Sequence, residues 1–136
     1  MPLKGLRLAV LSACETGLGE LTESEGVEGL QRAFHLAGCP HVIASLWKVD
    51  DDATLALMTF FYRNLWEKKL DAAEALRQVQ LTIYRNPLAV EVAKKRGLDF
   101  TEKDLPKVDP TVQGPRSPTV HWAAFTFSGV RVASKR

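Results

Sequence analysis

Cys14 is the residue whose type and position in this sequence most directly suggest chemistry. It follows the apolar run of residues 6–13, LRLAVLSA, and precedes a stretch that contains Gly17 and Gly19. A thiol is nucleophilic as its thiolate, which needs a base, typically a histidine within hydrogen-bonding reach. Free cysteine is also among the residue types most often buried as a small hydrophobe. The residue pattern alone therefore leaves two interpretations of Cys14 open.

The three histidines are poorly placed to act as that base. His35 falls inside a predicted helix, and His41 opens a predicted strand at the edge opposite to Cys14. His121 lies near the start of the last predicted strand, and the pattern does not fix its orientation. Cys39 with His35 and His41 lacks the second ligand pair of a zinc site, so we expect no metal and no other cofactor.

Two other motifs have ordinary structural explanations. The segment 14–26, CETGLGELTESEG, is too long and acidic for a dinucleotide-binding loop and lacks the third glycine before a helix. The aspartates Asp50, Asp51 and Asp52 precede an apolar helical pattern and are typical of a helix cap.

The elements that position these residues follow the order strand, helix, strand. Residues 6–13 and 41–47 are apolar runs of strand length, and residues 27–37 between them carry a helical apolar face that Gly38 and Pro40 end. This order builds a parallel pair with a right-handed crossover. We therefore expect Cys14 and the segment 47–52 at the same edge of a sheet, where open parallel sheets bind ligands.

Two further helices and a last strand follow. One helix is expected over 53–65, and another starts at Asp71 in a capping-box pattern and stops before Asn86 and Pro87. Residues 88–118 are predicted as an irregular excursion with one helical turn near 89–95, and VHWAAFTFSGV as the last strand. The predicted fold is α/β, a single domain over 1–136 with about three mostly parallel strands and three helices.

Composition limits the function classes. The chain has 136 residues, 46% of them hydrophobic, and a net charge of +2, which is too small for phosphate-backbone binding to explain the protein. No apolar stretch has the roughly 18 residues of a membrane span, and no export signal opens the sequence. We expect a cytoplasmic protein with free thiols that binds neither nucleic acid nor membrane.

Six ordered blocks resemble the carboxyl-terminal half of CHAT domains, the caspase-like domains often found behind TPR repeats in bacteria. The blocks are LSACETG, EGVEGLQRAFHLAG, HVIASLWKVDDDAT, LMTFFYRNL, AEALRQVQL and HWAAFTFSG. The match covers most of the chain from Leu6 to Gly129, and only residues 88–118 match loosely. The resemblance implies a fold of the caspase and separase class of cysteine peptidases, in which Cys14 occupies the position of the nucleophile.

The segment LWKVDDD also resembles the LWDVTD segment of separases, whose last aspartate faces a basic side chain of the substrate. By this resemblance Asp51 would bind an Arg or Lys of the substrate through charge-assisted hydrogen bonds. Trp47 would form a wall of the same pocket. Helix capping for Asp51 and simple packing for Trp47 remain open.

The sequence departs from the family pattern in one respect. Caspase-like peptidases carry a histidine followed by glycine before the cysteine strand, and no His-Gly pair occurs in these residues. We therefore expect the carboxyl-terminal portion of a CHAT-type cysteine endopeptidase that is inactive alone. Its expected partners are a protein or peptide substrate and TPR repeats or an amino-terminal half-domain that supplies the histidine. The alternative is a non-catalytic interaction module, either a pseudopeptidase or the product of a split gene.

Overall fold

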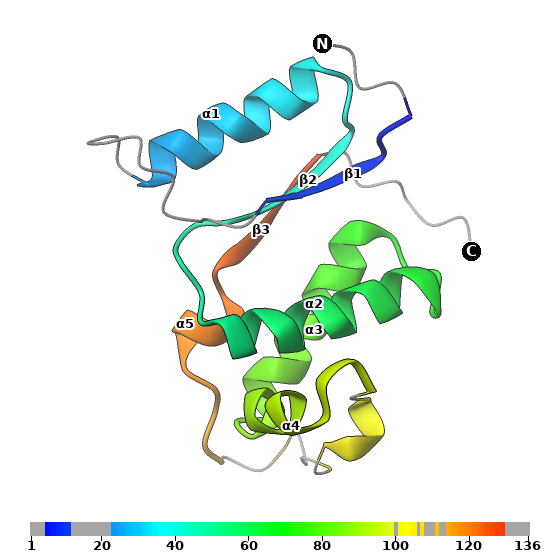
Figure 1. The fold of residues 1–136 in the computed structure, drawn as a ribbon, viewed down its shortest axis with the longest axis vertical. Helices are drawn as coiled ribbons and strands as arrows, with labels where there is room; N and C mark the ends of the chain where they lie inside the picture. Colours follow the sequence, from blue (N-terminus) through cyan, green and yellow to red (C-terminus); the bar gives the residue numbers. More distant parts are fainter. Residues whose placement is uncertain are drawn as a thin grey trace. The chain divides into compact units, whose positions relative to one another are not determined.

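The computed structural model of the chain contains one mixed sheet with the strand order β1-β2-β3 (Figure 1). β1 (Leu8–Leu11) runs parallel to β2 (His41–Ser45), and β3 (Phe125–Gly129) runs antiparallel to β2. The predicted α/β class is confirmed. β1 begins two residues after the start of the predicted run 6–13, and β2 ends two residues before the end of the predicted run 41–47.

The structure describes residues 5–11, 23–99, 101–105, 107, 111 and 114–129. The chain forms two compact units, the first comprising Met1–Val49 with Ala124–Arg136 and the second Asp50–Ala123. Within the described part, no helix is long and apolar enough to cross a lipid bilayer.

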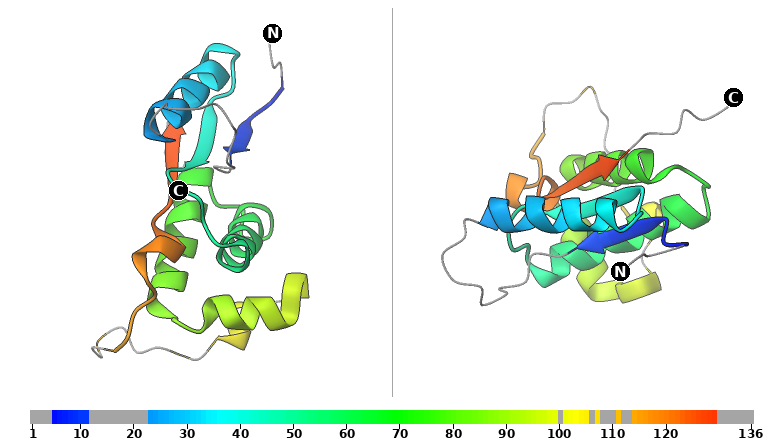
Figure 2. Two further views of the ribbon diagram at one scale, coloured as in Figure 1. Left: turned by 60° about the vertical axis from the view of Figure 1, so that its left-hand side comes forward. Right: turned by 90° about the horizontal axis from the view of Figure 1, so that it is seen from above.

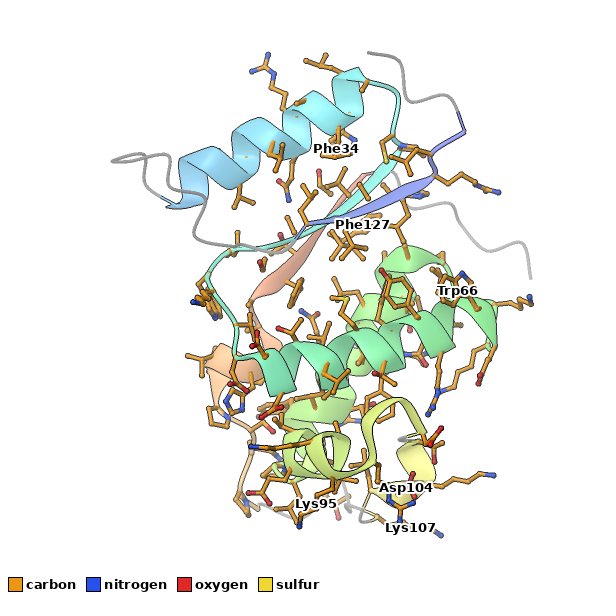
Figure 3. The ribbon with its side chains drawn as sticks, in the orientation of Figure 1. Phe34, Trp66, Lys95, Asp104, Lys107 and Phe127 are labelled. Atoms are coloured by element: carbon orange, nitrogen blue, oxygen red, sulfur yellow. The ribbon has the colours of Figure 1, made fainter. Side chains whose placement is uncertain are left out.

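In the first unit, α1 (Glu23–Leu36) covers one face of the sheet (Figure 2). Phe34 on α1 packs against a buried cluster of Ala9, Cys39 and Val42, and its ring points toward the sheet (Figure 3). The helix starts at Glu23, four residues before residue 27, where its start was predicted. The first turn has the polar sequence ESEG, and apolar periodicity detects only turns that carry apolar residues.

A Schellman motif ends α1 at the predicted glycine. Gly38 has a φ of +100° and its N–H donates to the carbonyl oxygen of His35 at 3.0 Å, while the N–H of Cys39 donates to that of Phe34 at 3.0 Å. These two bonds satisfy carbonyl groups that the helix end would leave without partners. The motif turns the chain directly into β2.

The second unit is helical. It contains α2 (Asp51–Trp66), α3 (Ala72–Arg85), α4 (Ala89–Arg96) and α5 (Thr119–Trp122), with short 3-10 turns at Gly97–Asp99 and Glu102–Asp104. The side chain of Asp50 caps α2 and that of Asp71 caps α3, accepting backbone N–H groups at 3.2 and 2.9 Å. Both predicted caps are confirmed.

The prediction of three helices is wrong, because this unit also contains α4 and α5. α4 has eight residues, more than the single turn expected, because Ala89 and Ala93 are enough to bury one side of it while its last turn is basic. The first residues of the predicted last strand form α5, where Trp122 packs edge-on against Tyr84 with ring centroids 5.2 Å apart. Small alanines and a single aromatic contact leave no recognisable period in a sequence.

Candidate functional site at the carboxyl edge of the sheet

The carboxyl ends of β1 and β2 lie at one edge of the sheet. Leu8 pairs with His41 and Leu11 with Ala44, so the two strands run in register and end together. β3 begins at the same edge, where the N–H of Leu46 donates to the carbonyl oxygen of Ala124 at 2.8 Å. The expected convergence of strand ends is therefore present. Cys14, three positions after Leu11, lies outside the described residues.

Trp47 lies in the segment that leaves this edge after β2. Its side chain is half-buried, while that of Ser45, the last residue of β2, is almost completely buried. The chain bends at Leu46 and Trp47 and then extends to the start of α2. Of the two predicted substrate-binding residues, Trp47 therefore occupies the connection that follows the central strand, and Asp51 is the first residue of α2.

The three consecutive aspartates have three different environments. Asp50 is the N-cap of α2, and the carboxylate of Asp52 lies 3.4 Å from the ammonium of Lys94. Asp51 is exposed in the first turn of the helix, and its carboxylate has no hydrogen bond or ion pair with any residue that the structure describes. Of the three, Asp51 has the carboxylate that can accept a charged ligand without losing an internal contact.

Two of the histidines lie at the opposite edge of the sheet. His41 opens β2 and pairs with Leu8 and Gly129, and His35 is bonded to Ser128 of β3, whose partner on β2 is Val42. Leu11 pairs with Ala44, two residues farther along β2, which is about 7 Å at the usual rise of a strand. The prediction that His41 opens a strand at the edge opposite to the end of β1 is confirmed. His35 belongs to a helix as predicted, but it lies in the last turn of α1 and not in the middle. His121 belongs to α5 and is half-buried.

The sequence did not predict the hydrogen bonds of His35. Its ring bonds to the carbonyl oxygen of Cys39 and to the hydroxyl of Ser128, which is 93 positions away. Cys39 is buried, and its thiol donates to the carbonyl oxygen of His41 at 3.2 Å. Among the described residues, no three His, Cys, Asp or Glu side chains come together as metal ligands.

A hollow of about 410 Å³ lies along α2, and none of the predicted site residues lines it. The ring of Tyr62 stacks on that of Trp66 in its wall, with centroids 4.8 Å apart. Trp66 is 64% exposed, and its labelled side chain stands at the end of the helix (Figure 3). The lining residues are Leu55, Met58, Thr59, Tyr62, Arg63, Trp66 and Glu67.

Comparison with known families shows to which family the chain belongs. The family model of the CHAT domain matches residues 1–130. The chain belongs to the CHAT domain family. It is thereby related to the caspase-like cysteine peptidases, as the ordered sequence blocks indicated. No curated protein and no solved structure matches the chain.

Proposed function

We propose that this CHAT chain is the carboxyl-terminal portion of a caspase-like cysteine endopeptidase with Cys14 as its nucleophile. The observation that carries the proposal is the family match over residues 1–130, which includes Cys14 and the parallel strands β1 and β2. The parallel register of β1 and β2 supports it, since the strand before Cys14 and the strand before Trp47 end at one edge.

In the proposed reaction the Cys14 thiolate attacks the carbonyl carbon of the scissile peptide bond. A bond forms from Sγ to that carbon, the C–N bond breaks, and the proton taken from the thiol by the base passes to the leaving amine. Water then hydrolyses the thioester and restores the thiol. The backbone N–H of Cys14 would help to stabilise the oxyanion in both steps.

The base of this reaction would come from outside the 136 residues. No His-Gly pair occurs in the sequence, and His35 and His41 lie at the opposite edge of the sheet. An amino-terminal half-domain would supply the histidine, and TPR repeats would be an associated partner. Because general-base catalysis contributes about 10²–10⁴-fold, the chain alone is expected to hydrolyse no peptide at a measurable rate.

The test compares the chain alone with the chain mixed with a polypeptide that carries the missing His-Gly pair. Peptides with Arg, Lys or apolar residues before the scissile bond serve as substrates. Cleavage is expected only in the mixture and is expected to disappear in Cys14→Ala. Cleavage by the chain alone that also requires Cys14 would contradict the missing-base argument and would make His121 the next candidate.

Asp51 is proposed to select a basic side chain of the substrate, and Trp47 is proposed as a second substrate-binding residue. The exposed carboxylate would pair with Arg or Lys, and charge-assisted hydrogen bonds of this kind contribute about 1.5–3 kcal/mol. In the active mixture, Asp51→Asn should lower kcat/KM for Arg and Lys substrates by roughly 10–100-fold and leave apolar substrates unchanged. Asp52→Asn is the matched control because its carboxylate already faces Lys94. Equal losses in both variants would exclude a substrate role for Asp51.

A non-catalytic interaction module is the second candidate. The absence of a His-Gly pair is the observation that favours it. A module of this kind would bind the same amino-terminal polypeptide or TPR partner, and the complex would cleave none of the peptides. Binding with equal affinity by the wild type and Cys14→Ala, without cleavage by either, would favour this candidate over the peptidase.

A further inference from the structure

Ser128, His35 and the main-chain carbonyl of Cys39 form a continuous series of hydrogen bonds in the first unit. The Nε2 atom of His35 lies 2.8 Å from Oγ of Ser128, and its Nδ1 atom lies 2.9 Å from the carbonyl oxygen of Cys39. Both distances are typical of well-formed hydrogen bonds. The imidazole thus bridges the end of α1 and strand β3.

The carbonyl oxygen determines the tautomer of the neutral ring. A carbonyl can only accept, so the proton of His35 is assigned to Nδ1, and Nε2 carries the lone pair. The hydroxyl of Ser128 must then donate to Nε2. A hydroxyl that donates to an imidazole, whose other nitrogen is held by an acceptor, has the geometry of an activated nucleophile with its base.

Two features of the fold suit this pair to a reaction. The side chains of His35 and Ser128 are both only half-buried, so a small electrophile can reach the hydroxyl. His35 lies in the last turn of α1, and the bond of its Nδ1 atom to the carbonyl oxygen of Cys39 holds the ring with Nε2 toward Ser128. Ser128 pairs with Val42 near the start of β2. Ser128 and His35 are therefore separate from the sheet edge to which the proposed function assigns Cys14.

We propose that Ser128 is a nucleophile, with His35 as its general base, that accepts acyl groups from small carboxylic esters. The Oγ atom forms a bond to the ester carbonyl carbon, and the C–O bond to the alcohol breaks. The hydroxyl proton moves to Nε2 of His35 and then to the leaving alkoxide. Water hydrolyses the acyl-serine with the same histidine as base, and the serine hydroxyl is restored.

Thr126 provides a matched control on the same strand. It lies two positions from Ser128 and therefore on the same face of the sheet, and it is also half-buried. Its hydroxyl donates to the carbonyl oxygen of Ala44 at 3.3 Å, so no base takes its proton. If Ser128 reacts merely because it is accessible, Thr126 should react as well.

The experiment uses the full chain in a Cys14→Ala background, which removes acylation of that thiol. A fluorophosphonate probe and p-nitrophenyl acetate test the hydroxyl, and mass spectrometry maps the modified residue. With the probe, an Oγ–P bond forms and fluoride leaves, while the proton passes through His35 to solvent. We expect modification at Ser128 and not at Thr126, with a rate at least 100-fold lower in His35→Gln.

Chemical rescue separates a base from a structural bridge. In His35→Ala, added imidazole should restore part of the labelling at Ser128, because a free imidazole can replace a base but not a link between α1 and β3. Circular dichroism and continued protection of the buried Cys39 thiol would show that the variants are folded. Absence of labelling at Ser128 in the folded Cys14→Ala chain, or an equal rate in folded His35→Gln, would overturn the proposal.

Discussion

Cys39 owes its position to the turn that ends α1. Gly38 reverses the chain, and the thiol of Cys39 then lies in the cluster with Ala9 and Val42, where it is 1% exposed. We predict that a thiol reagent modifies Cys39 in the Cys14→Ala variant only after unfolding, because a buried thiol reacts through opening of the fold. Rapid modification under native conditions, measured by mass spectrometry, would contradict the observed packing.

Asp104 is the residue for which a pH effect follows from the structure. Hydrogen bonds from the backbone N–H and the hydroxyl of Thr101 hold its pKa below the ordinary value of 3.8. Burial opposes this effect, and the weaker attractions of Arg96 and Arg63 add to it. The folded pKa is below the unfolded one, so this group stabilises the fold above about pH 3.8. Its contribution is lost as the pH falls through the folded value.

An NMR titration of the side-chain carbon of Asp104 would measure this effect. The midpoint is expected below that of the same residue in the urea-unfolded chain. Thr101→Ala should raise it, because the hydroxyl bond of 3.0 Å is removed while the backbone bond remains. Identical midpoints in the folded and unfolded chains would show that the turn does not form in solution.

At the scale of the elements, two glycines differ in the space that surrounds them. Gly129 ends β3 with a φ of +146°, and a Cβ there would collide with the carbonyl oxygen of Pro40 and lie 3.1 Å from the ring of His41. Gly26 lies in α1 with open space around its Cβ position. Gly129→Ala should therefore weaken the pairing of β2 with β3, and Gly26→Ala should stabilise α1.

Urea unfolding of Gly129→Ala and Gly26→Ala would test this pair of predictions. Gly129→Ala is expected to lower the free energy of unfolding by about 2 kcal/mol, because strain and overpacking act together. Gly26→Ala should raise it by about 0.5–1 kcal/mol through helix propensity and the reduced entropy of the unfolded chain. A loss of stability in both variants would mean that the space around α1 is not open.

At the scale of the whole molecule, the relevant feature is the edge of the sheet at β1. Among the described residues only β2 pairs with it, so one row of its backbone donors and acceptors lacks a strand partner. An apolar strand with an open edge is a template for pairing with another chain. We predict that the isolated protein self-associates or requires a partner that adds a strand beside β1.

Light scattering across a concentration series, with hydrogen exchange at Leu8–Leu11, would test this prediction. The apparent mass should rise with concentration, and the amides that face away from β2 should gain protection as it does. A stable monomer in which those amides exchange fast would show that the edge is tolerated uncovered. It would also remove the physical reason for expecting a partner at β1.

Local signals in the sequence were sufficient for much of this molecule. Asp50 and Asp71 predicted their helix starts, Gly38 predicted the end of α1, and apolar runs predicted the parallel strands β1 and β2. Each signal depends on residues within a few positions of one another, where backbone geometry and capping chemistry act directly. The ordered blocks around Cys14 predicted the CHAT family, which the family model confirmed.

The tertiary structure alone decided which side chains meet. The buried Asn64 of α2 donates to the carbonyl oxygen of Ala75 in α3, and Asp52 faces Lys94. The residues near Asn64 and Asp52 in the sequence do not indicate these partners. The same holds for His35 and Ser128, which come together because α1 packs over the sheet and β3 joins β2 from the far end of the chain. Contacts of this kind are set by packing between elements, which a one-dimensional pattern does not encode.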